Sequence, residues 1–257
     1  MFDTNLSNKV ATKILVVGGS THNPCTPCKI RDALVKTRFL DEWAVIFANH
    51  RYWKINDTKY CRTAYKFKIE KEFEGIKINL IDDQLKTHDV FTGHIYILPD
   101  SFPMVTTYTT FSMCNCVPQI RVMEYKLEDS ESLLQQSEQN ETEVSIELGK
   151  DALGNDRKYF PNIDRIMTEV ANNYNRLESI AGLIICGMDG DGAIGLQKIK
   201  SKGGKTAVQH PDECICTNAD SMPKASLKLD NNHSVIYLEV ASTVTTLTEW
   251  LSDIKWR

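Results

Sequence analysis

Short apolar runs alternate along the chain with longer segments in which apolar residues recur at helical spacing. Runs of about four to eight apolar residues are typical of strands buried on both faces. The predicted strands are residues 13–17, 43–49, 76–82, 93–99, 182–186, 206–209 and 233–239. The predicted helices are residues 28–40, 55–73, 163–174, 191–203, 222–229 and 243–256. This alternation predicts an α/β fold with a doubly wound, mostly parallel sheet and helices on both faces.

Two segments differ from this alternation. Residues 104–126 are rich in Val, Thr, Tyr and Cys, which favours a β-ribbon. Residues 127–158 are acidic, amide-rich and poor in aromatics, which is typical of an exposed insertion rather than a separate domain. Because no linker or repeat divides the chain, we expect residues 1–257 to form a single domain.

Charge and hydropathy exclude several classes of function. The net charge is −4, so no overall basic field attracts nucleic acid. No apolar stretch approaches the roughly 18–20 residues that span a bilayer, and residues 1–13 contain no apolar signal core. We expect a soluble, cytoplasmic protein without membrane insertion.

Three predicted strands lead into a polar side chain of a kind used in hydrolysis. Ser20 follows ILVVGG, His50 follows WAVIFAN, and Asp191 follows GLIICGMDG. Because the carboxyl ends of parallel strands meet at one edge of a sheet, we expect these side chains to converge there. A serine, a histidine and a carboxylate are the nucleophile, general base and orienting acid of a hydrolytic triad.

Ser20 and His50 each also have an ordinary structural interpretation. Serine often caps the N-terminus of a helix, and Gly18 and Gly19 are expected to form a tight turn before Ser20. Imidazole titrates near neutral pH and suits general-base catalysis, but a histidine at a strand end need not be catalytic. The competing histidines are His22, His88, His94, His210 and His233.

The segment GMDGDGAIG, residues 187–195, contains the G-x-G-x-x-G pattern of dinucleotide-binding loops. Asp189 and Asp191 would repel a pyrophosphate, and the next strand ends in Gln209 instead of a ribose-binding acid. We therefore expect no dinucleotide cofactor. At the start of the helix predicted over 191–203, the dipole of that helix would stabilise the Asp191 carboxylate, which suits the acid of a triad.

The chain has eight cysteines, six of them in one C-x-x-C and two C-x-C pairs. Cys25 and Cys28 lie near the start of a predicted helix, where redox-active thiols occur in other proteins. Thiols without a special role are the first expectation. A structural metal or disulfide is the second, and a catalytic dithiol is the third.

Several segments, in matching order, resemble the catalytic domain of CheB-type protein-glutamate methylesterases. ILVVGGST resembles that family's first strand and Ser-Thr pair, GHIYILP resembles PGHxYIAP, and PNIDRIM resembles PSVDxLF. IICGMDGDGAIGLQKIKSKGGKTAVQ and the later SMPKASL resemble the more specific block TGMGxDGAxGLxxIxxAGGxTxAQ…GMPxxA. The resemblance covers about residues 13–230 and suggests a stand-alone, divergent version of that domain.

The resemblance implies a doubly wound α/β fold and a serine esterase that needs no cofactor or metal. In it Ser20 is the nucleophile, His50 the general base and Asp191 the orienting acid. Met188 would offer its backbone N–H to the oxyanion, with Thr21 assisting. The family hydrolyses glutamyl methyl esters, and deamidates glutamines, on the cytoplasmic helices of chemoreceptors. Methylated chemoreceptor helices, or a related protein substrate, are the expected partner.

Two stretches depart from the family pattern. Residues 22–24 (HNP) stand where glycines usually follow the Ser-Thr pair, and residues 51–52 (RY) replace Met-Pro after the histidine. The leading hypothesis is a CheB-like esterase acting on a protein carboxyl ester. One alternative is a catalytically idle CheB-like binding module in signalling, and another is a thiol or metal protein using Cys25 and Cys28.

Overall fold

The centre of the protein is a parallel sheet of seven strands in the order β10-β9-β8-β1-β2-β5-β3. The computed structural model describes residues 9–20, 25–50, 69–81, 86–98, 107–124, 162–187, 190–214, 221–238 and 245–255. The strands of the sheet are β1 (Lys13–Gly19), β2 (Ala44–Asn49), β3 (Lys77–Leu80), β5 (His94–Ile97), β8 (Ser179–Ile184), β9 (Lys205–Gln209) and β10 (Ser234–Ile236). Neighbouring strands all pair in parallel, which confirms the predicted fold class.

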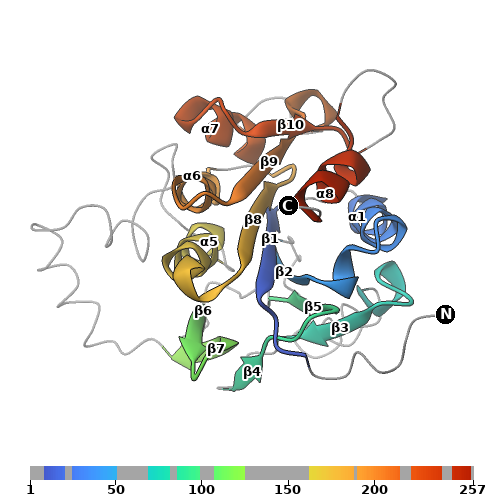
Figure 1. Ribbon diagram of the computed structural model, residues 1–257. Helices are drawn as coiled ribbons and strands as arrows, with labels where there is room; N and C mark the ends of the chain where they lie inside the picture. The colour runs from blue at the N-terminus through green and yellow to red at the C-terminus, as the bar shows by residue number, and fades with distance from the viewer. Residues whose placement is uncertain are drawn as a thin grey trace, which may run out of the picture.

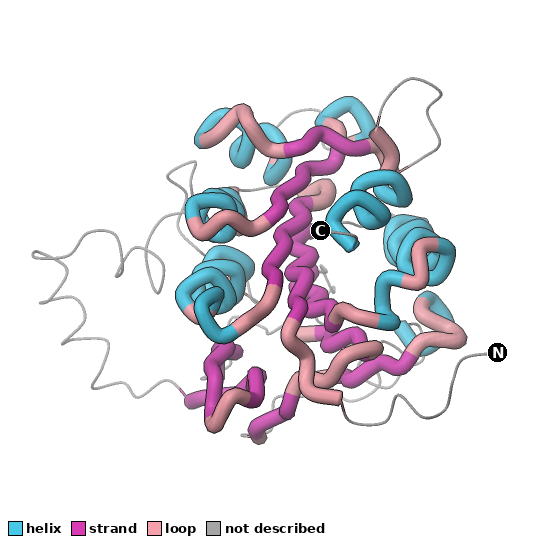
Figure 2. Tube along the Cα trace, viewed as in Figure 1, coloured by secondary structure: helices cyan, strands magenta, loops and turns pink. Residues whose placement is uncertain are grey.

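Helices cover both faces of this sheet (Figures 1 and 2). One face carries α5 (Ile163–Asn172), α6 (Ala193–Ser201) and α7 (Met222–Leu229), and the other carries α1 (Cys25–Lys36) and α8 (Leu247–Lys255). Alternate residues of β1 divide between the faces: Ile14 and Val16 pack on the α5 side, Leu15 and Val17 on the α1 side. Burial on both faces explains why this strand is a continuous apolar run.

A smaller antiparallel sheet of three strands, in the order β4-β7-β6, lies beside α5. Its hairpin, β6 (Thr107–Cys114) and β7 (Val117–Glu124), falls within the ribbon predicted over 104–126. Asn115 and Cys116 connect the strands with φ of 49° and 65°, as a two-residue hairpin turn requires. Strand β4 (Thr87–Asp89) was not predicted, because its three residues form a strand only through pairing with the distant β7.

Gly18 and Gly19 are the last residues of β1, so the tight turn expected from the sequence is wrong. A Cβ at Gly18 would lie 2.3 Å from Ile163 Cγ2, and one at Gly19 would lie 2.2 Å from Ile185 Cγ1. Close packing, rather than a turn, therefore requires these glycines. As a result β1 stays extended up to Ser20.

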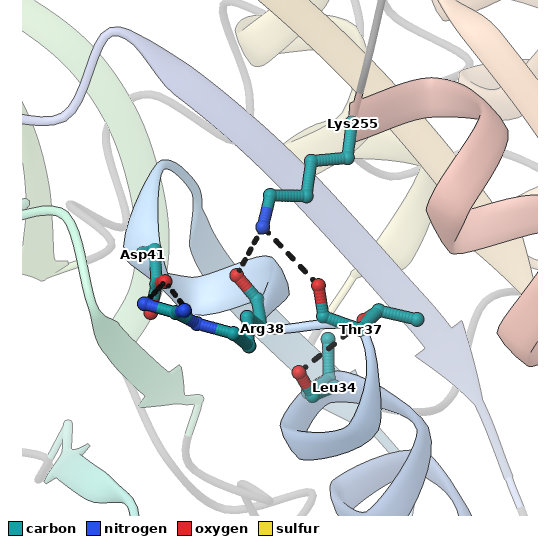
Figure 3. A network of polar contacts seen from close by, with 5 residues as sticks. All are labelled: Leu34, Thr37, Arg38, Asp41 and Lys255. Atoms are coloured by element: carbon teal, nitrogen blue, oxygen red, sulfur yellow. Dashed lines mark hydrogen bonds and ion pairs between the residues drawn. The ribbon is translucent and has the colours of Figure 1, made fainter. Parts of the chain in front are cut away.

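Helix α1 is displaced toward the N-terminus relative to the predicted 28–40. It ends because Arg38 has a φ of 53°, in the left-handed region. The Lys255 ammonium of α8 donates to the carbonyl oxygens of Thr37 at 3.2 Å and Arg38 at 2.9 Å (Figure 3). Because the last carbonyls of a helix lack partners within it, this lysine caps α1 and ties the C-terminal helix to it.

Some predicted segments lie partly or wholly outside the described residues. The helix predicted over 55–73 is described only from residue 69, where it is helical. The acidic segment 127–158 lies outside the described residues. Among the helices of the described ranges, none combines the length and apolarity needed to cross a membrane.

Candidate active site

On the two sides of β1, the helices that follow the strands lie on opposite faces of the sheet. This strand has β2 on one side and β8 on the other. The chain leaves β1 into α1 on one face, whereas β8 connects α5 to α6 on the opposite face. Such a switch point, at the carboxyl ends of the strands, is where open α/β sheets bind their ligands.

Ser20 and His50 are neighbours at this edge. Gly19 and Asn49 are the last paired residues of β1 and β2, and Ser20 and His50 follow them. The backbone ladder continues, since His50 N donates to Gly19 O at 2.7 Å. Only 9% of Ser20 and 4% of His50 is exposed. Residues at the same level of parallel strands point to the same face, here the face covered by α5.

His50 contacts Asp191. Nε2 of His50 lies 3.0 Å from Oδ2 of Asp191, and both side chains are more than nine-tenths buried. Ile163 N donates to Oδ2 at 2.9 Å, and Asp164 N donates to Oδ1 at 3.0 Å. These are backbone groups of the first turn of α5, whose positive end stabilises the carboxylate.

This arrangement corrects the sequence-based account of Asp191. The prediction placed Asp191 in the first turn of its own helix, but α6 begins at Ala193. Gly192 has a φ of 92°, a conformation that a side chain would strain, and it turns the chain before the helix starts. The dipole that stabilises the Asp191 carboxylate therefore belongs to α5.

The contact between His50 and Asp191 assigns the proton of the neutral imidazole. A carboxylate can only accept, so Nε2 carries the hydrogen and Nδ1 carries the lone pair. Nδ1 is therefore the nitrogen that can accept a proton from a nucleophile. An ionised Asp191 also stabilises the imidazolium that this transfer would create.

A second buried carboxylate links α5 to α6. Asp164 is 0% exposed, and its Oδ1 accepts a hydrogen bond of 2.6 Å from Gly195 N. A Cβ at Gly195 would lie 2.7 Å from the carbonyl oxygen of Asp164, so the helices approach closely only because this residue is glycine. The link is reciprocal: Asp191, just before α6, binds the start of α5, and Asp164, in α5, binds the start of α6.

Cys186 and Gly187, which follow β8, are held against Ser20. Ser20 N donates to Cys186 O at 3.0 Å, and Met222 N donates to Gly187 O at 3.0 Å. A Cβ at Gly187 would lie 2.3 Å from Met222 Sδ and 2.8 Å from Ser20 N. Helix α7 starts at this point because the Ser221 hydroxyl caps it. Cys186 and Gly187 are thereby fixed between β1 and α7.

Thr21 and Met188, predicted to assist Ser20 and to bind the oxyanion, lie outside the described residues, as does His22. The other competing histidines lie elsewhere. They are His88 on β4, His94 at the amino end of β5, His210 just after β9, and His233 beside Thr206. Of the histidines that the structure describes, His50 forms the ion pair with Asp191.

The cysteines do not build a metal site in the described part of the chain. Cys28 lies half-buried in the first turn of α1, and the side chain of Cys25 is not described. Cys114 and Cys116 are unbridged thiols of the β6–β7 hairpin. Within the described ranges, no group of three or more His, Cys, Asp or Glu residues could hold a metal ion.

Two polar residues at the site were missed from the sequence. Gln209 ends β9, and its Oε1 accepts from Cys186 N at 2.7 Å. The rule that singled out Ser20 and His50, a polar residue at the end of a buried strand, also applies to Gln209. The available signal for Asp164 was a carboxylate among the apolar residues that open a predicted helix.

Comparison with known proteins gives consistent matches. Residues 82–243 match the family model described as CheB methylesterase. Over 96 residues the chain is 38% identical to "Protein-glutamate methylesterase/protein-glutamine glutaminase 1" of Geobacter sulfurreducens. It is 36% identical, also over 96 residues, to "Protein-glutamate methylesterase/protein-glutamine glutaminase 5" of Geobacter metallireducens. These matches cover 37% of this chain and 23% of each relative, so the matched part spans about a quarter of their length.

The fold also matches a solved structure. The Thermotoga maritima CheB methylesterase catalytic domain superposes with a TM-score of 0.58, covering 96% of this chain and 98% of that chain. The sequence identity in this superposition is 15%, so the likeness concerns the fold.

Proposed function

This chain belongs to the CheB methylesterase family, and on that basis we propose that it is a serine hydrolase that cleaves carboxyl esters of a protein substrate. The observation that carries the proposal is the 3.0 Å contact between His50 Nε2 and Asp191 Oδ2, with Ser20 following the strand that pairs with the one before His50. A buried imidazole–carboxylate pair next to a serine is the arrangement that serine hydrolases use.

In the proposed reaction Ser20 Oγ attacks the ester carbonyl carbon while its proton passes to His50 Nδ1. The Met188 N–H stabilises the resulting oxyanion, with assistance from Thr21. The bond to the methoxy oxygen then breaks, and methanol leaves with the proton from His50. Water, deprotonated by His50, attacks the acyl-enzyme and releases the carboxylic acid and Ser20. Asp191 orients His50 throughout.

We further propose that the substrate is a glutamyl methyl ester on the cytoplasmic helices of a methylated chemoreceptor or a related protein. The names of the two Geobacter relatives support this ester class, and their glutaminase designation supports a second reaction, deamidation of glutamine. In that reaction ammonia replaces methanol as the leaving group. The proposed setting is the cytoplasm, with no nucleic-acid partner and no insertion into the membrane.

Methanol release from a methylated receptor cytoplasmic fragment tests the proposal. Ser20→Ala is expected to lower kcat by on the order of a million-fold, because the nucleophile is lost. Ser201→Ala is the matched control, since Ser201 is exposed on α6 and its hydroxyl donates to Lys198 O within the same helix. A fluorophosphonate should label Ser20 in the wild type and in the control.

Two outcomes would contradict the proposal. One is unchanged methanol release by Ser20→Ala. The other is a folded wild type that binds receptor fragments but neither releases methanol nor reacts with the fluorophosphonate, which would identify an idle binding module.

A further inference from the structure

Gln209 is the last residue of β9, where the strand still pairs with β10 but no longer with β8. The pairing of β8 with β9 ends at Ile184 and Val208, and the chain then turns into a short 3-10 helix at Pro211–Glu213. The Gln209 side chain is buried, with 5% of the residue exposed, and its Oε1 accepts from Cys186 N at 2.7 Å. The Gln209 side-chain carbonyl therefore accepts a hydrogen bond from the segment just after β8, at a level where the backbone of β9 no longer pairs with β8.

The residue that Gln209 holds is also bonded to the nucleophile. Cys186 N donates to Gln209, and Cys186 O accepts from Ser20 N at 3.0 Å. Gly187, which follows, has no space for a side chain, because a Cβ there would lie 2.8 Å from Ser20 N. A shift of Cys186 would therefore be transmitted to the backbone of Ser20.

The Gln209 amide is oriented by a carboxylate. Its Nε2 donates to Glu213 Oε2 at 3.2 Å, and the same oxygen accepts from Leu238 N at 2.9 Å. Rotating the amide by half a turn would place NH₂ against the Cys186 N–H and a carbonyl against a carboxylate. An amide side chain meets both requirements, since it accepts at one atom and donates at the other.

We propose that Gln209, oriented by Glu213, is a positioning residue for Ser20 and acts through Cys186. This inference rests on the proposed esterase function. Gln209 has no part in proton transfer. It holds the backbone of the nucleophile at the distance that attack requires, and a displacement of about 1 Å there costs on the order of a hundredfold in rate.

The test uses isosteric exchanges between these two side chains. Gln209→Glu keeps the acceptor for Cys186 N but places a carboxylate against Glu213. It is expected to lower kcat by about a hundredfold, with KM changed less than about twofold. Combining Gln209→Glu with Glu213→Gln removes the repulsion between two carboxylates, but the side-chain atom at position 213 that faces Leu238 N must remain an acceptor, so the hydrogen bond between the two side chains is not rebuilt. The double variant is expected to recover part of the loss, with kcat about tenfold above that of Gln209→Glu.

The pH profile separates positioning from a loss of folded protein. Two facing carboxylates share a proton more readily as the pH falls, which restores a hydrogen bond between them. The ratio of kcat for Gln209→Glu to kcat for the wild type should therefore rise as the pH decreases from 8 to 6, while the exchange variant shows no such rise. Gln197→Glu, the same substitution at an exposed position of α6, should leave the ratio constant.

All rates are methanol release from the methylated receptor fragment, divided by the concentration of sites titrated with fluorophosphonate. An unchanged kcat per titrated site in Gln209→Glu overturns the inference, as does failure of the double exchange to raise it. If Gln209→Glu does not fold, Glu213→Gln takes its place, with an expected loss of about tenfold because a neutral oxygen holds the Gln209 amide less strongly than a carboxylate does; an unchanged kcat in this variant likewise overturns the inference. If Ser20→Ala is as active as the wild type, the esterase proposal itself has failed.

Discussion

Asp164 and Gly195 join the first turns of α5 and α6 through a hydrogen bond of 2.6 Å from Gly195 N to Asp164 Oδ1. Asp164→Ala would leave this buried N–H without its acceptor, at an expected loss of about 2–3 kcal/mol in the free energy of unfolding. Asp164→Asn keeps an oxygen in place and is expected to lose less than half as much. Urea unfolding measures both losses.

The control for this prediction is Asp212, whose side chain is 86% exposed. Asp212→Ala is expected to change the free energy of unfolding by less than about 0.5 kcal/mol. If Asp164→Ala is equally mild, the hydrogen bond to Gly195 does not stabilise the packing of the two helices.

Gly187→Ala should impair catalysis more than stability alone explains. The added Cβ would meet Ser20 N at 2.8 Å, and backbone on both sides limits how far either group can move. We expect kcat per titrated site to fall by about a hundredfold. Gly75→Ala is the control, because Gly75 has a φ of 84° and no atom within 4 Å of an added Cβ. It should lose stability from backbone strain but keep the wild-type kcat.

Lys255→Met should destabilise the protein without affecting the site. The variant would lose the hydrogen bonds that the Lys255 ammonium donates to Thr37 O and Arg38 O (Figure 3). We expect the free energy of unfolding to fall by about 1–2 kcal/mol. The end of α1 lies toward the amino edge of the sheet, opposite Ser20, so kcat should not change. Lys36→Met, at an exposed position of α1, should have little effect on the free energy of unfolding. Equal losses of stability in Lys36→Met and Lys255→Met would argue against the cap.

His233 should make stability depend on pH. Burial is the main cause that lowers its pKa from 6.5. The charge of Lys200 acts in the same direction, and Asp230 opposes it. Near pH 6.5 the unfolded chain takes up a proton that the folded protein resists, so the free energy of unfolding decreases as the pH falls below 6.5. Above that pH, His233 is neutral in both the folded and the unfolded protein, and its contribution to the pH dependence of stability disappears.

His233→Gln isolates this contribution. Glutamine can keep a hydrogen bond to Thr206, which the imidazole Nδ1 makes at 2.8 Å, but it does not titrate. Urea unfolding of both proteins from about pH 7.5 to 5.5 should show a smaller decrease for the variant. Parallel curves would mean that His233 does not resist protonation in the folded protein.

Much of the sheet could be predicted from local sequence. The apolar runs before Ser20 and His50 are strands because both faces of β1 and β2 are buried, and burial on two faces requires uninterrupted apolar residues. Their polar ends then had to lie at one edge, which predicted that Ser20 and His50 would converge there; the pairing of β1 with β2 makes them neighbours. Gly18 and Gly19 were assigned to a turn because only the packing of α5 and Ile185 shows why they are small.

The sequence by itself determined the strands of the parallel sheet, the fold class and the edge of the sheet where the polar residues gather, since these follow from apolar periodicity and strand direction. Only the tertiary structure decided how Asp191 is held. Its backbone donor Ile163 lies 28 residues away, on a helix that meets it through packing. The same holds for Gln209 and its partner Cys186, because hydrogen bonds between distant segments depend on geometry that no local pattern encodes.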